Sequence, residues 1–179
     1  MFSAASTGVF TVQTLESLLN SLPQVGRLEW IGLRPARLGD ISIVNKAEVI
    51  AERGIAGDHR FEGRRGSKRQ VTLIQAEHLL AVAGMLHRAD LPPELVRRNL
   101  VISGINLLAL KGKQFQVGNV LLEYSGPCEP CSRMETVLGP GGYNAMRGHG
   151  GITAKVIEGG TIHIGDSVQA KLMMPDEVA

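Results

Sequence analysis

The sequence has few cysteines and few aromatic residues, and these shortages narrow what the chain can be. Its 179 residues contain two cysteines, Cys128 and Cys131, too few for a disulfide scaffold at this size. Aromatic residues make up 4% of the chain, so a core drawn from its 44% hydrophobic residues must consist mostly of Val, Ile, Leu and Ala. We therefore expect one domain with an aliphatic core, in a reducing, cytoplasmic setting.

Long apolar runs and a strong net charge are also missing. No apolar stretch approaches the roughly 18 residues of a membrane span. The first residues lack the basic region and long apolar stretch of a signal peptide. The formal net charge of +2 is too small to indicate nucleic-acid binding by itself. We expect neither a membrane nor a nucleic acid among the partners.

Glycine, by contrast, is abundant, and the 22 glycines break the chain into short β-like runs. The runs cover residues 27–34, 47–54, 70–74, 99–103, 114–118, 120–126, 151–160 and 161–170. One stretch, 75–86, spaces its apolar residues as a helix does, and two prolines soon follow it. Strands at this spacing predict a mainly β fold, a closed β-barrel with a few peripheral helices.

The start of the chain, residues 1–24, differs from this pattern and predicts an N-terminal extension. Four leucines recur there at helical spacing before a proline: Leu15, Leu18, Leu19, Leu22 and Pro23. We expect a short helix whose apolar stripe packs on the main body. The remaining residues, 25–179, are predicted to form a single β-barrel domain.

A glycine-rich basic stretch, residues 54–70, is the first candidate for chemistry. Between Asp58 and Arg69 it sets five cations against two carboxylates: Arg60, Arg64, Arg65, Lys68 and Arg69 against Asp58 and Glu62. Its glycines keep the backbone supple, which suits wrapping around an anionic group. The alternative is a solvated surface loop. The stretch is not a P-loop, because the required spacing of glycines and lysine is absent.

A second candidate, Arg97-Arg98-Asn99, stands just before a predicted strand. Arginine can make a bidentate contact with phosphate or carboxylate, and the Asn amide can both donate and accept, as reading a heterocycle edge requires. The alternative is that the arginines extend from a helix end and Asn99 caps a turn. A third feature, His149 among glycines beside Arg147, suits close approach to a ligand but equally an ordinary turn.

The C-x-x-C of Cys128 and Cys131 is the fourth candidate. Two prolines stiffen its loop, and residues 132–139, with Arg133, predict a short helix that would favour a thiolate at its start. Four uses compete: half of a zinc site, a thioredoxin-type redox pair, two inert buried cysteines, or one reactive or metal-ligating thiolate. The last is favoured because scattered histidines make a poor zinc set and no βαβ context surrounds the pair.

Together these stretches resemble the MOSC domain, the family named for the C-terminal domain of molybdenum cofactor sulfurase. The matching runs are GIAGDHR, RRNLVISGINL, FQVGNVLLEYSGPCEPC and GGTIHIGDSV, which span roughly residues 47–170. The resemblance implies a barrel similar to that of pyruvate kinase. Cys131 falls on the family cysteine, whereas Cys128 stands where many members have arginine, and Arg98 stands where many bacterial members have glutamate. Both departures are similar to the amidoxime-reducing component branch.

The resemblance implies that Cys131 is the catalytic residue and the protein ligand of molybdenum in a molybdopterin cofactor. The implied cofactor-binding residues are Asp58, His59, Arg60, Lys68, Arg69, Gln70, Arg97, Arg98 and Asn99. Arginine and lysine would hold the phosphate, and the amides of Asn99 and Gln70 would read the pterin edge. Cys128, Arg133 and His149 are possible accessory residues.

The implied activity is reduction of N-hydroxylated compounds or related N–O substrates. Electrons would come from a separate electron-transfer protein, because the sequence has no flavin or iron–sulfur motif. Two alternatives stay open. One is a sulfur carrier that takes a persulfide on Cys131 from a pyridoxal-phosphate cysteine desulfurase. The other is a cofactor-binding module without catalysis.

Overall fold

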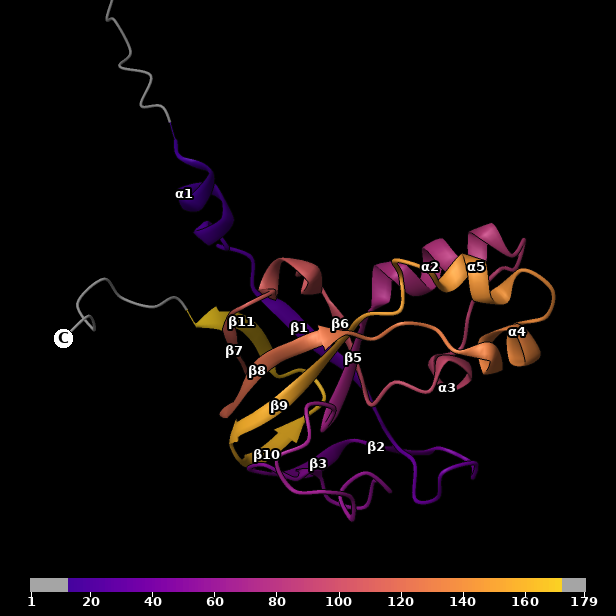
Figure 1. The fold of residues 1–179 in the computed structure, drawn as a ribbon, viewed down its shortest axis with the longest axis horizontal. Coiled ribbons are helices and arrows are strands. Elements are labelled where there is room, and N and C mark those ends of the chain that lie inside the picture. The colour runs from indigo at the N-terminus through magenta and orange to yellow at the C-terminus, as the bar shows by residue number, and fades with distance from the viewer. Residues whose placement is uncertain (1–12, 172–179) are drawn as a thin grey trace, which may run out of the picture.

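The computed structural model describes residues 13–171, and seven of its strands close into a β-barrel (Figure 1). Around the barrel the order is β11-β7-β8-β9-β5-β6-β1, and β11 pairs back onto β1. The strands are β1 (Gly26–Leu33), β5 (Val71–Gln75), β6 (Leu100–Ser103), β7 (Gln114–Val117), β8 (Val120–Pro127), β9 (Ile152–Glu158) and β11 (Ser167–Lys171). Each coincides with a run predicted from the sequence, and the closed barrel is confirmed.

Smaller strands complete the β structure. β2 (Ser42–Val44) extends the barrel sheet beside β1, and β10 (Gly160–His163), β3 (Lys46–Ile50) and β4 (Gly54–Ile55) form a three-stranded sheet. The pairing of β5 with β6 is parallel, and the other barrel pairings are antiparallel. β2 and β4 were not predicted, because strands of two or three residues are too short to show an alternating pattern.

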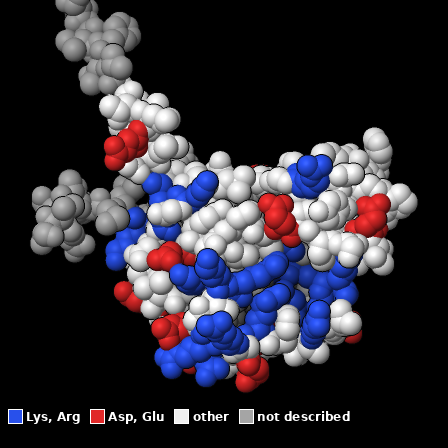
Figure 2. Space-filling model, viewed as in Figure 1, with Lys and Arg blue, Asp and Glu red and all other residues white. Residues whose placement is uncertain are grey.

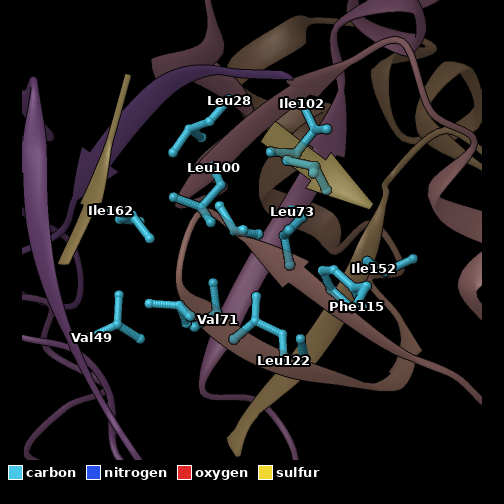
Figure 3. Close-up of a cluster of buried hydrophobic side chains, with 14 of the residues drawn as sticks. Leu28, Val49, Val71, Leu73, Leu100, Ile102, Phe115, Leu122, Ile152 and Ile162 are labelled. Carbon is cyan, nitrogen blue, oxygen red and sulfur yellow. The ribbon is translucent and has the colours of Figure 1, made fainter. Parts of the chain in front are cut away.

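The barrel interior is filled by aliphatic side chains that alternate along the strands (Figure 3). Leu28, Leu73, Leu100, Leu122 and other buried residues point inward from five or more strands. Phe115 adds a fully buried aromatic ring. This composition agrees with the aliphatic core that the scarcity of aromatics predicts.

Four helices cover one side of the barrel: α2 (Ala76–Met85), α3 (Pro93–Val96), α4 (Ser132–Leu138) and α5 (Gly142–Met146) (Figure 1). Their buried residues pack with Ile74 of β5 and Val101 of β6 in a second apolar cluster. Both faces of β5 are therefore buried, and its two polar residues, Thr72 and Gln75, are buried with the apolar ones. The sequence predicts α2 and α4, but not α3, α5 or the 3₁₀ helix η1 (Leu107–Leu110).

The N-terminal helix forms, but it does not pack as expected. α1 (Leu15–Asn20) is capped by the Thr14 hydroxyl, which accepts a hydrogen bond from the Ser17 amide at 3.1 Å. Its leucines Leu15, Leu18 and Leu19 are 71%, 51% and 61% exposed, so the predicted stripe against the barrel is wrong for them. Leu22, which follows the helix, is partly buried and packs against the barrel core. Residues 1–12 of the predicted extension lie outside the described residues. Within residues 13–171, no helix is long and apolar enough to cross a membrane.

A buried polar network joins the end of β1 to the basic stretch and to the start of β6. The Arg34 guanidinium forms a bidentate ion pair with Asp58, with Nε–Oδ2 at 2.9 Å and Nη2–Oδ1 at 3.2 Å. Arg34 Nη2 also donates to Asn99 Oδ1 at 2.8 Å, and Asn99 Nδ2 donates to Asp58 Oδ2 at 2.8 Å. Thr72 of β5 donates to the same amide oxygen. The network thus fixes four segments against one another.

The electrostatics of the network favour an ionised Asp58. Burial of the carboxyl raises its pKa, but the hydrogen bonds and charge of Arg34, with the backbone N–H groups of Arg60 and Arg34, outweigh burial and lower the pKa below its ordinary value. An ionised buried carboxylate is tolerable because its oxygens accept several hydrogen bonds. The ion pair of Arg34 and Asp58 therefore stabilises the fold only while both of its members are present.

We expect Phe115→Ala to lower the free energy of unfolding by about 3–5 kcal/mol, because it removes a fully buried ring and leaves a cavity. Chemical denaturation monitored by circular dichroism measures the change. Leu108→Ala, at a 43% exposed position of η1, is the control and should change stability little. Equal effects of the two substitutions would contradict the described core.

Asp58→Ala should destabilise the fold by about 3–5 kcal/mol, because it leaves the Arg34 guanidinium buried without its partner. Because the folded-state pKa of Asp58 is lowered, its contribution is present above its unfolded-state value, about pH 4, and is lost as the pH falls through the folded-state pKa. Denaturation between pH 7 and pH 2 should show this acid-dependent loss in the native protein and less of it in the variant. Matching profiles would argue against the network.

Candidate functional site

The two cysteines lie in different surroundings where β8 ends. Cys128 is 1% exposed, whereas Cys131 is exposed at the start of α4 and makes no side-chain capping bond there. This asymmetry leaves Cys131 as the accessible thiol.

Arg98 holds the cysteine loop in place. It is 5% exposed and donates three hydrogen bonds to backbone carbonyls: to Val96 at 2.7 Å, Gly150 at 2.8 Å and Cys128 at 3.0 Å. Gly150 must be glycine here, because an added Cβ would lie 2.2 Å from the Cys128 carbonyl oxygen. Through these bonds Arg98 joins the cysteine loop, the glycine loop and the end of α3, and its predicted ligand role stays a prediction.

Arg97 is a second clamp. It adopts a left-handed backbone with φ of 56° and donates to the carbonyls of Gly39 at 3.0 Å and Arg37 at 3.2 Å. Burial lowers the pKa of Arg97, and the nearby guanidinium groups of Arg133 and Arg34 lower it further. The side chain therefore orders the loop between β1 and β2 and adds positive charge beside Arg133.

Three other arginines have donors that the protein leaves unused. The Nε atoms of Arg60, Arg69 and Arg133 are buried and lack a hydrogen-bond partner among the described residues. Burial lowers the pKa of Arg60, and the charges of Arg69 and Arg34 add to this effect. Arg69 places a second donor, Nη2, 2.9 Å from Cys128 Sγ. Unpaired guanidinium groups that repel one another in a partly buried site are suited to bind an anion.

The space-filling view (Figure 2) shows how the charged side chains are distributed on one face of the molecule. Basic side chains gather around a hollow in the lower half of that face, with few acidic side chains among them (Figure 2). Burial lowers the pKa of Arg98, while Cys128 and Cys131 act in the opposite direction, so both cysteines lie within electrostatic range of this guanidinium. The cysteines and the arginines thus belong to one site.

Several predicted ligands are instead used inside the protein. The Asn99 amide is fully buried and is occupied by Arg34, Thr72, Asp58 and the Gly32 carbonyl. The Gln70 amide donates to the Ser67 carbonyl at 2.8 Å and accepts from the Val156 amide at 2.9 Å. The Asn99 amide therefore has no free group to read a pterin edge, whereas the buried Gln70 amide has one partner at each of its two polar atoms.

Two further predicted ligands lie at the edges of this region. His59 Nδ1 lies 3.2 Å from the Arg34 carbonyl oxygen, and burial is the main cause that lowers the pKa of the imidazole. Lys68 is exposed on the basic stretch, and its carbonyl accepts a hydrogen bond from the Ser125 hydroxyl. Asp58 belongs to the buried network. Of the predicted basic ligands, Arg60 and Arg69 remain the ones with unused buried donors.

His149 packs against His78, which the sequence analysis did not select as a candidate. Its ring lies edge-on against His78 of α2, with centroids 5.0 Å apart. Burial and the neighbouring His149 lower the pKa of His78. In the part of the chain that the structure describes, no three His, Cys, Asp or Glu side chains are grouped to hold a metal ion. A zinc site built from protein ligands therefore has no support there.

Arg34 is the most important residue that the sequence analysis missed. It follows β1 in a short Arg-Pro run, which gave no periodic signal, and its partners lie 24 and 65 positions away. The one feature of the sequence that could have indicated its role was the position of an arginine at the end of an apolar strand. The role of Thr72 was missed for a similar reason, because it lies within a continuous strand and its partner Asn99 is 27 positions away.

Comparison with solved structures places the fold among known proteins. YuaD of Bacillus subtilis superposes with a TM-score of 0.72 at 19% identity, covering 84% of this chain and 97% of that one. YiiM of Escherichia coli gives 0.62 at 19% identity, covering 84% and 72%. YiiM of Geobacillus stearothermophilus gives 0.64 at 16% identity, covering 82% and 75%. At these identities the likeness shows the fold alone.

Sequence comparisons give the family. No curated protein matches this chain. The family model for the MOSC domain matches residues 58–169, from the ion-paired Asp58 through Cys131 and into β11. This segment makes up more than half of the chain and contains the arginine and cysteine site described above. The chain therefore belongs to the MOSC domain family.

Proposed function

We propose that this protein binds a molybdenum cofactor, with Cys131 as the protein ligand of the metal. The MOSC domain is a family known for molybdenum cofactor binding. The observation that carries the proposal is a set of three arginines whose buried Nε atoms have no partner among the described residues, one of which, Arg69, contacts the loop that carries the exposed Cys131. A site with this composition is suited to a ligand that is both anionic and able to accept a soft sulfur donor.

The residues present fit the chemistry of the cofactor. Its phosphate carries negative charge and several acceptor oxygens, which match the unused donors of Arg60, Arg69 and Arg133. Burial lowers the pKa of Arg60, and an anion there would offset the repulsion from Arg69 and Arg34 that lowers this pKa further. Cys131 is exposed and has no capping bond to break before it could ligate a metal.

The clamps would preorganise this site. Arg98 fixes the carbonyls of Cys128 and Gly150, so the loop that carries Cys131 starts from a fixed point. The Cys128 sulfur accepts a hydrogen bond from Arg69 Nη2. This bond orients the guanidinium and leaves its Nε unused. The protein would therefore bind and orient the ligand with little rearrangement.

For the reaction, we propose reduction of N-hydroxylated compounds. The bound cofactor would supply two-electron redox chemistry at molybdenum. Reduction breaks the N–O bond, consumes two electrons and two protons, and releases the dehydroxylated base and water. The exposed position of Cys131 leaves the substrate a route to the site, and the electrons would come from a separate electron-transfer protein.

Protein produced in cells that make the cofactor should contain about one molybdenum and one pterin per chain. Cys131→Ser should lose most of the molybdenum, because it replaces the soft ligand. Elemental analysis and pterin fluorescence measure the two contents. Cys128→Ser is the matched control and should keep the metal, since a hydroxyl can still accept from Arg69. Equal metal loss in both variants, or no metal in the native protein, would contradict the assignment.

The same exposed thiol supports a second candidate, a sulfur carrier. The Cys131 thiolate would attack the outer sulfur of a persulfide on a cysteine desulfurase, forming a new S–S bond and releasing the desulfurase thiolate. Mass spectrometry after incubation with a desulfurase and cysteine should show one added sulfur on Cys131. The buried Cys128 should stay unmodified. An unchanged mass at Cys131 would exclude the carrier function.

A further inference from the structure

The loop between β1 and β2 points to where a protein partner binds. We propose that residues 35–40, with the basic side chains around the cysteine site, form a docking surface for an acidic electron-transfer protein. The class of partner rests on the proposed function, which requires an external source of electrons. The surface itself is argued from exposure, order and charge.

The loop is ordered by its backbone, and its side chains are left free. Arg97 donates to the carbonyls of Arg37 and Gly39, and the Gly39 amide donates to the Ala36 carbonyl at 3.2 Å. The Leu38 side chain is nevertheless 72% exposed. A leucine held outward on a fixed loop binds a partner with a small loss of conformational entropy.

The loop lies at the rim of the cysteine site. Arg34, at its start, donates to the Arg97 carbonyl at 3.1 Å. The Arg97 guanidinium in turn is within electrostatic range of Arg133, two residues after Cys131. A protein that covers Leu38 would therefore place its own surface beside the exposed thiol, as electron transfer over a short distance requires.

The charge around this rim selects an acidic partner. Arg37 and the basic stretch of residues 60–69 add exposed cations to the half-buried arginines, and Arg65 of that stretch is ion-paired with Glu52 at 2.6 Å. The other exposed carboxylates close by in the sequence are Asp40, Glu62, Glu129 and Glu135. Figure 2 shows the resulting concentration of basic side chains on one face. Such a field accelerates and orients the encounter with an acidic surface.

A protein fits this surface better than a nucleic acid does. Nucleic-acid strands are held by aromatic rings that stack on the bases, in addition to positive charge. The aromatic residue of the basic stretch, Phe61, is half-buried, and the Arg53 guanidinium lies 5.9 Å from its ring centroid. Leu38 is the exposed apolar side chain of this surface. It suits a protein interface with a small hydrophobic centre and a charged rim.

The test measures binding directly, without turnover. Isothermal titration at low ionic strength would use an acidic [2Fe–2S] ferredoxin as the probe and cytochrome c, a basic protein, as the control probe. The double variant Arg37→Glu, Leu38→Asp changes two exposed side chains and leaves the loop hydrogen bonds, which are made by backbone atoms. Its matched control is Leu108→Asp, Lys113→Glu, which replaces an exposed leucine and a cation by carboxylates beside α1, where Lys113 donates to Asn20.

We expect the ferredoxin to bind the native protein and the control variant with the same affinity. It should bind the loop variant with an affinity about tenfold lower. Added salt should weaken the native complex. Absence of ferredoxin binding, equal affinity of the loop variant, or equal binding of cytochrome c would overturn the proposal. Molybdenum content and turnover with a viologen reductant report on the proposed function separately, so failure of either hypothesis is recognised on its own.

Discussion

The buried ion pair of Arg34 and Asp58, joined by Asn99, is the constraint on which the rest of the site depends. These side chains come from the end of β1, the basic stretch and the entry to β6, and the structure satisfies their polar groups against one another. Removing one member leaves the others buried without partners, so the arrangement holds as a unit. The network also holds the backbone of two neighbouring arginines. The Arg60 N–H donates to Asp58, and the Arg97 carbonyl accepts from Arg34.

Around that constraint the arginines divide into two groups by what their donors contact. Arg34, Arg97 and Arg98 donate to backbone carbonyls or to the network and fix the shape of the loops. In the second group, each arginine keeps a buried donor that has no partner within residues 13–171; its members are Arg60, Arg69 and Arg133. The division explains how one small area can be both rigid and strongly basic. The first group holds the backbone, and the second is available to a ligand.

Secondary structure was largely readable from the sequence, whereas the use of each polar residue was not. The barrel strands appeared as alternating or β-branched runs because alternate residues face the core. The leucines of α1 showed a helical spacing but are exposed, since spacing predicts a helix and does not supply a surface for it. Asn99 and Gln70 were suitable types for a ligand, but each found partners within the protein.

By itself, the sequence determined the β-barrel, the aliphatic core and the cysteine loop after β8. It did so because these features depend on local pattern and composition. Tertiary structure alone decided that Cys128 is buried and Cys131 exposed, that Arg98 is a clamp, and that Arg34 pairs with Asp58. Those outcomes depend on contacts between residues far apart in the chain, and no local pattern encodes which of several suitable partners a buried polar group will meet.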